Sequence, residues 1–445
     1  MSSKFNLKIV IKNLFKSSTI SNMITVGFAS LLVSFFGFFK EILIADSFGL
    51  SELLDTFYVA MLLPGFVSGV FLRSFNSVFI PNYVSELKTG KNIGAFQSTS
   101  ILITVGVALL FLIFAILFTD VYLEVFFENH TQSYYDLVKL QFYFVAPCII
   151  FWGFSSLISG LLTIDNEFRL SSISSIFIAL SIIVCLVFFK EQLGNLVLAL
   201  GTLIGSILSF VFLAITAFKR GILFMNMPDF KSANIIILFR QLPAKVSSSL
   251  LSGINPIIDQ YFSAQLIVGS IAALNYGIKI PAFAISIVGL SVGNVLLPYF
   301  SKKAVDNKEL LFKEIKKILK YLIVVGLVIM VILVVVSQPI IWLIFERNAF
   351  TGDDTVIVSK IQQMYLLQIP SYIVGLIMVK FLTAINKNNF MVLASVMNLL
   401  LNITFNFILI DLMGVYGLAL ATSIVSIVNS LILYLYINKL NKQYV

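Results

Sequence analysis

Two stretches of this sequence decide how the chain is organised: "LLPGFVSGVFLRSFNSVFIP", residues 62–81, and "KIPAFAISIVGLSVGNVLLP", residues 279–298. In each stretch two prolines stand 17 residues apart, and the second stretch follows the first at an offset of 217. Further along, "LALGT" at 198–202 matches "LALAT" at 418–422, at an offset of 220. Matches that keep their order and offset predict an internal duplication, with halves at residues 1–222 and 223–445.

The composition places the chain in a lipid bilayer. Of its 445 residues 59% are hydrophobic and 11% are charged, and the mean hydropathy is +1.02. A soluble domain carries about 25% charged residues. The composition therefore predicts an integral membrane protein.

Several function classes do not fit this composition. The net charge of +9 is spread over short loops, which does not suggest a nucleic-acid partner. The chain has one histidine, and its two cysteines, Cys148 and Cys185, lie in apolar runs, so no metal site or cofactor is expected. No GxxxxGK[ST] motif occurs, which argues against a nucleotide partner.

The apolar runs are long enough to cross the membrane, since a spanning helix needs about 20 apolar residues. They predict an all-α protein with about 12 transmembrane helices in two parallel six-helix repeats around a central cavity. The twelve predicted spans are 19–40, 56–82, 97–119, 136–163, 170–189, 193–218, 233–263, 268–299, 321–345, 356–385, 390–410 and 414–437.

The basic residues give the orientation of these spans. They concentrate at both termini and in alternate loops, whereas the opposite loops hold only Lys190 and Arg347 among many acids. The positive-inside rule then puts both termini in the cytoplasm. Six spans per half give both halves the same orientation, a design in which transporters place substrate between the halves. A duplicated scaffold without transport is the alternative.

Three cations lie deep in predicted spans. Arg73, Lys245 and Lys279 are each roughly 10 residues or more from a span end, which is about 15 Å of helix. A lone cation at that depth is costly unless it faces a wet cavity or a partner. The excess of deep cations predicts a cavity for an anion such as phosphate. An ion pair between Lys279 and Asp259 is the competing explanation.

Four long motifs carry a resemblance to a known family. They are "GFFKEILIADSFGLSELLDTFYVAMLLPGF" at 37–66, "INPIIDQYFSAQLIVGSIAALNYGIKIPAFAISIVGLSVGNVLLPYFSK" at 254–302, "LIFERNAFTGDDT" at 343–355 and "GVYGLALATSIVSIVNSLILY" at 414–434. In this order, over essentially the whole chain, they resemble the MurJ/MviN-type lipid II flippases. That family lies within the multidrug/oligosaccharidyl-lipid/polysaccharide exporter superfamily.

The resemblance implies a transporter and not an enzyme. Its fold would be two six-helix bundles enclosing a cavity. Its substrate would be an undecaprenyl-diphosphate-linked cell-wall or polysaccharide precursor, with lipid II favoured, carried from the inner to the outer leaflet of the bacterial cytoplasmic membrane by alternating access. Enzymes of cell-envelope synthesis would be candidate partners.

The resemblance also bears on individual residues. Lys40 stands where the family usually has Arg in its "GF-x-R-[DE]" pattern, and Lys279 stands where it often has Arg in "LNYAYRL". Lys40 lies close to the outer end of the first span, so its depth alone would suit a snorkelling lysine. Asp55 and Asp259 match acids of the family, although a helix N-cap role would also explain Asp55.

The sequence departs from the family pattern at other positions. Ser34, Ser68 and Gly69 stand where the family often has Arg, and Lys245 has no evident counterpart. Arg73, about one turn beyond Gly69, is a candidate replacement. The predicted substrate-binding set is Lys40, Arg73, Lys245, Lys279, Asp55 and Asp259.

Three alternatives stay open at this point. One is a flippase for another lipid-linked oligosaccharide, such as an O-antigen or capsule unit. The second is a multidrug antiporter of the same superfamily, whose cavity would favour carboxylates over cations. The third is a membrane glycosyltransferase or polymerase, which would need catalytic carboxylates or a sizeable outer loop.

Overall fold

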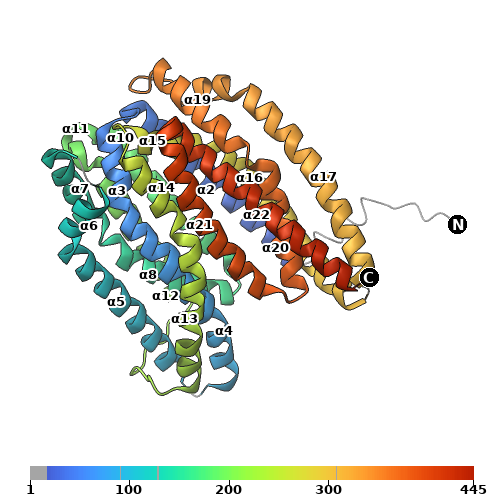
Figure 1. Cartoon of the computed structure of the whole chain (residues 1–445). Helices are drawn as coiled ribbons and strands as arrows, with labels where there is room; N and C mark the ends of the chain where they lie inside the picture. The colour runs from blue at the N-terminus through green and yellow to red at the C-terminus, as the bar shows by residue number, and fades with distance from the viewer. Residues whose placement is uncertain (1–17, 91, 128–129, 307, 445) are drawn as a thin grey trace. The chain divides into compact units, whose positions relative to one another are not determined.

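The structure is a computed structural model that describes residues 18–90, 92–127, 130–306 and 308–444 (Figure 1). Within these ranges every extended regular element is a helix, and the β-structure is limited to an isolated bridge between Arg347 and Phe350. Eleven helical segments of the described part are long and apolar enough to cross a membrane. The predicted all-α membrane fold is confirmed.

The eleven segments correspond to eleven of the twelve predicted spans. The exception is 233–263, where the structure has two helices, α13 (Ala233–Gly253) and α14 (Asn255–Ala264). Pro256 lies in the first turn of α14 and has no N–H to continue the hydrogen-bond ladder of α13. The prediction of one continuous span was wrong here.

The chain forms two compact units. Unit 1 comprises residues 1–44, 60–121 and 132–249, and unit 2 comprises residues 45–59, 122–131 and 250–445. The predicted boundary at residue 222 refers to the sequence repeat and stays a prediction.

The helices from the N-terminus to α12 are α2 (Ser18–Phe48), α3 (Glu52–Val67), η1 (Ser68–Leu72), α4 (Arg73–Thr89), α5 (Ile93–Leu117), α6 (Thr119–Phe126), α7 (Gln132–Val145), α8 (Cys148–Ile164), α9 (Phe168–Ile173), α10 (Ile176–Phe188), α11 (Lys190–Leu193), η2 (Gly194–Leu196) and α12 (Val197–Lys219).

The helices after α14 all belong to unit 2. They are α15 (Ser270–Gly277), α16 (Lys279–Asp306), α17 (Lys308–Val335), α18 (Ser337–Phe345), α19 (Gly352–Leu366), α20 (Ile369–Ala384), α21 (Asn388–Met413) and α22 (Val415–Tyr444). Their core includes three rings, since Phe381 of α20 packs edge-on against Phe300 of α16 and Phe312 of α17, with ring centroids 5.8 and 5.2 Å apart. Such pairs contribute about 0.5–1.5 kcal/mol beyond the area that they bury.

In unit 1, α13 packs against α4, as Figure 1 shows. Phe75, Phe79 and Tyr83 repeat every four residues on α4, so they lie on one face and stack with centroids 6.3 and 5.5 Å apart. Ile235 and Leu238 of α13 are buried in the same cluster. The first helix of the second sequence half is therefore part of the unit that holds most of the first half.

Two glycines bring α12 close to α10 in unit 1. A Cβ added at Gly205 would stand 2.5 Å from the Cα of Ile178, and one added at Gly201 would stand 3.0 Å from the Cα of Ile182. Small residues four positions apart allow membrane helices to approach closely and pack through van der Waals contact. This contact holds α12 rigidly and so positions its end at Lys219.

Two pairs of turns repeat the same backbone geometry at an offset of 220. Asn166 and Asn386 both have positive φ, 62° and 59°. The residue after each asparagine bonds back to a leucine, Glu167 N to Leu162 O and Lys387 N to Leu382 O. Gly194 and Gly414 likewise share positive φ, 48° and 56°. This agreement in local structure supports the duplication predicted from the sequence.

Candidate substrate-binding site

Arg73 is the first residue of α4, directly after the wide π-helical turn η1. Its backbone N–H bonds to Ser68 O, five residues back, and this extra residue in the turn rotates the following side chains relative to α3. Such turns often occur at functional sites. The Arg73 side chain is exposed, and no ion-pair partner is found for it among the residues described.

Lys245 lies on α13, and its backbone contacts the start of α4. The Ser74 hydroxyl donates to the backbone oxygen of Lys245 at 3.2 Å and to the hydroxyl of Ser249 at 2.7 Å. The Lys245 side chain is exposed, and it too has no ion-pair partner within the described ranges. Two cations 172 positions apart in the sequence are thus placed on adjoining turns of two packed helices.

Polar bonds continue along the contact between α4 and α13. The Asn82 amide donates to Gln241 Oε1 at 2.9 Å, and the Asn234 amide donates to Glu86 Oε2 at 2.6 Å. Interhelical hydrogen bonds of this kind help membrane helices to associate, because the hydrophobic effect does not drive association within apolar lipid. We call the contacts of Ser74, Asn82 and Glu86 with α13 the α4–α13 polar ladder; its spacing fixes the register of the two helices.

Lys40 lies in α2 and has an immediate partner. Its Nζ is 2.8 Å from Glu41 Oε1, and its side chain is 22% exposed. The neighbouring carboxylate offsets part of the charge that the sequence assigned to an anion cavity. Lys40 therefore differs from Arg73 and Lys245, for which the described residues provide no ion pair.

Asp55 belongs to unit 2, where it caps another helix. Its two carboxylate oxygens accept from the backbone N–H groups of Gly269 at 2.6 Å and Ala272 at 2.8 Å, at the start of α15. A carboxylate is stabilised at a helix N-terminus by the orphan N–H groups and the helix dipole. Asp55 is buried, and this arrangement gives it a structural role.

Asp259 of α14 is buried among amides. Its Oδ1 accepts from Asn406 at 2.8 Å and from Asn402 at 3.2 Å, both on α21. These asparagines stand four residues apart and therefore share one face of the helix. Neither asparagine was among the predicted site residues, although two asparagines at that spacing inside an apolar span are a usable signal.

Lys279 is the first residue of α16, also in unit 2, and its side chain is half-buried. The preceding Ile278 lines a groove of about 550 Å³, whose walls include Ala282 and Ile285 of α16 and Tyr372 and Leu376 of α20. The structure thus puts three predicted residues, Lys40, Arg73 and Lys245, in unit 1 and the other three in unit 2. The described residues contain no group of three or more His, Cys, Asp or Glu that could hold a metal ion.

Comparison with known families agrees with this architecture. The family model described as "Lipid II flippase MurJ" matches residues 44–444. A probable lipid II flippase MurJ of Buchnera aphidicola subsp. Schizaphis graminum is 29% identical over 432 residues, which cover 93% of this chain and 82% of that protein. One from Rickettsia prowazekii is 26% identical over 438 residues, covering 95% and 84%.

Solved structures give the same result. A structure titled "Lipid II flippase MurJ, inward closed conformation" matches with a TM-score of 0.81 and 26% identity, covering 93% of this chain and 87% of that one. An inward-facing MATE family multidrug transporter matches with a TM-score of 0.76 at 12% identity, covering 95% and 98%, which shows a shared fold. The chain belongs to the MurJ family of lipid II flippases, which are multi-pass membrane transporters and not enzymes.

Proposed function

We propose that this chain moves lipid II from the inner to the outer leaflet of the bacterial cytoplasmic membrane, with both of its termini in the cytoplasm. The family match supports the substrate. One observation of the structure carries the chemistry: Arg73 and Lys245, both exposed and free of an ion pair among the described residues, lie on adjoining turns of α4 and α13. Two uncompensated cations inside apolar spans suit an anionic ligand.

The diphosphate of the substrate is the group that these cations would hold. Arg73 offers a planar fork of N–H donors that can bind two phosphate oxygens together, and Lys245 adds a point charge beside it. Lys279 is proposed as a third contact, and Lys40 as a weaker one because Glu41 offsets its charge. Asp55 and Asp259 are proposed to support the structure, since their carboxylates are occupied by backbone and amide donors.

Complementation tests the substrate. The gene for this chain should restore growth to a bacterial strain depleted of its own lipid II flippase. Restored growth together with transfer of labelled lipid II to the outer leaflet is the expected result. Failure to restore growth, combined with rescue of a strain that lacks an O-antigen flippase, would instead assign the chain to another lipid-linked oligosaccharide.

Substitutions test the cations. Arg73→Ala, Lys245→Ala and Lys279→Ala should each lower the flipping rate by about tenfold or more, because a charged hydrogen bond contributes about 1.5–3 kcal/mol. Lys380→Ala is the matched control: Lys380 lies near the C-terminal end of α20, and we expect it to snorkel toward the membrane surface, so its loss should be milder. Full activity in all three variants, with normal amounts of folded protein, would refute the anion site.

A further inference from the structure

A groove opens at the end of α12 in unit 1, apart from the proposed substrate site. It has a volume of about 410 Å³ and is lined by Leu170 of α9 and by Phe212, Ile215, Thr216, Lys219 and Arg220 at the end of α12. Three of these side chains are apolar and two are cationic. The lining therefore changes along α12 from hydrocarbon to positive charge, as a phospholipid changes from acyl chain to headgroup.

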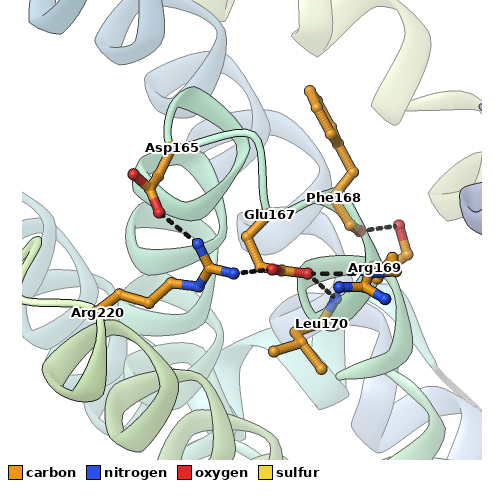
Figure 2. A network of polar contacts seen from close by, with 7 residues as sticks. Asp165, Glu167, Phe168, Arg169, Leu170 and Arg220 are labelled. Atoms are coloured by element: carbon orange, nitrogen blue, oxygen red, sulfur yellow. Dashed lines mark hydrogen bonds and ion pairs between the residues drawn. The ribbon is translucent and has the colours of Figure 1, made fainter. Parts of the chain in front are cut away.

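An ion-pair network holds the cationic end of this groove in place. Figure 2 shows Arg220 between two carboxylates: its guanidinium is 2.8 Å from Asp165 Oδ2 and also contacts Glu167 Oε2. Arg169 lies on the other side of Glu167, with Nε 3.5 Å from Oε1. Glu167 is buried and also accepts from the backbone N–H of Leu170, so the network joins the α8–α9 turn to the end of α12.

Lys219 is the cation that this network leaves uncompensated. Its side chain is exposed, and the described part of the chain offers it no ion-pair partner. The two acids Asp165 and Glu167 offset two of the three basic residues Arg169, Lys219 and Arg220, which leaves one net positive charge at the groove. One net charge matches the single negative charge of a monoanionic phospholipid headgroup.

The second repeat does not reproduce the cluster. At the offset of 220, Ile385 and Lys387 stand at the positions of Asp165 and Glu167, and Leu440 stands at the position of Arg220, whereas Lys439 stands at the position of Lys219. The turn itself is the same in both repeats, since Asn166 and Asn386 share positive φ. The turn therefore forms without the two acids and Arg220, so the ion-pair network is specific to the first repeat, whereas the lysine at position 219 is shared with the second repeat as Lys439.

We propose that the groove between α9 and α12 binds one monoanionic phospholipid of the inner leaflet. Lys219 contacts its phosphate, Arg220 is oriented by Asp165 and Glu167 to donate a further N–H, and an acyl chain lies against Phe212, Ile215 and Leu170. The location at the end of α12 suits a headgroup, because the loop that holds Arg220 and Lys231 follows Lys219 and is predicted to face the cytoplasm.

Lipid retention tests this proposal without reference to transport. The purified full chain is placed in nanodiscs with equal amounts of phosphatidylcholine and phosphatidylglycerol that carry the same acyl chains. The lipids that remain bound after release are then counted by native mass spectrometry. The wild type should retain phosphatidylglycerol in preference, and Lys219→Gln should lower that preference about fivefold, the effect of one basic residue near a membrane surface.

Two matched controls separate this groove from general effects. Lys231→Gln removes an exposed lysine from the same predicted inner loop without touching the groove. Ile215→Trp should fill the groove and lower lipid retention, whereas Ile204→Trp changes the same residue type on the same helix away from it; the two isoleucines are 50% and 42% exposed. Arg220 is left intact because its removal would deprive the buried Glu167 carboxylate of an ion-pair partner.

The outcomes are unambiguous. Loss of the phosphatidylglycerol preference in Lys219→Gln and Ile215→Trp, with both controls like the wild type, supports the site. A wild-type preference in Lys219→Gln, an equal loss in Lys231→Gln, or equal retention of the two lipids by the wild type would each overturn it.

Discussion

At the scale of single residues, the partners of a charged group indicate its role. Asp55 and Arg73 both lie in the helical segment Glu52–Thr89. Both oxygens of Asp55 are bonded to backbone N–H groups of α15, whereas Arg73 is exposed and lacks an ion pair within the described residues. The first arrangement caps a helix, and the second is the basis of the ligand contact that we propose for Arg73.

Asp55→Asn should destabilise the protein. The substitution removes the charge at the start of α15 and turns one hydrogen-bond acceptor into a donor that faces backbone N–H groups. We expect a loss of about 1–3 kcal/mol, the cost of unsatisfied buried donors, and a lower Tm in detergent.

Glu52→Gln is the control for Asp55→Asn, because Glu52 lies in the same first turn of α3 and is less buried. It should leave the Tm nearly unchanged. If Asp55→Asn keeps the wild-type Tm but abolishes flipping, Asp55 acts on substrate and the capping role assigned to it is wrong.

A double substitution separates substrate binding from internal pairing at Lys279. Asp259 already accepts from Asn402 and Asn406. We therefore expect Lys279→Gln to fold and to lose flipping, and Asp259→Asn/Lys279→Gln to show no recovery. Restored flipping in the double variant would show instead that Lys279 mainly neutralises Asp259, since removal of both charges removes the cost of either one alone.

At the scale of helices, the α4–α13 polar ladder joins elements from the two sequence halves. Ser74 Oγ and Ser249 Oγ are 2.7 Å apart, so cysteines at these positions should form a disulfide on oxidation. If the repeats move against one another during alternating access, that disulfide should block flipping, and a reductant should restore it.

Ser74→Cys/Ser248→Cys is the matched control for this cross-link. Position 248 is turned by about 100° on α13 relative to position 249, so its side chain does not face Ser74. We expect little disulfide and normal flipping. A Ser74–Ser249 disulfide that forms completely without slowing transport would show that α4 and α13 stay together throughout the cycle.

At the scale of the whole molecule, the positive-inside orientation can be tested by labelling. Gln192→Cys, in a predicted outer loop, should react with a membrane-impermeant maleimide in intact cells, and Met227→Cys, in a predicted inner loop, should react only after lysis. Both positions are exposed. The native Cys148 and Cys185 are buried and should add little background. Labelling of Met227→Cys in intact cells would invert the topology.

The sequence by itself determined the membrane class and eleven of the spans, and its repeated motifs predicted the duplication. These depend on local properties: a run of apolar residues must be helical in lipid, and an asparagine or glycine at a helix end can adopt positive φ whatever surrounds it. The duplication could be predicted for the same reason, because the matching stretches repeat a local sequence pattern. The break between α13 and α14 at Ile254 was not predicted, although Pro256 is a signal for a helix start.

Only the tertiary structure decided which charges have partners. Asp55 caps a helix that begins more than 200 residues later, Asp259 meets amides from α21, and Ser74, the neighbour of Arg73, donates to the backbone oxygen of Lys245. Depth in a span showed that Arg73 and Lys245 were costly, but it could not show what offsets the cost. A hydrogen-bond partner at that sequence distance is chosen by the packing of whole helices, which depends on shape and register over many residues at once.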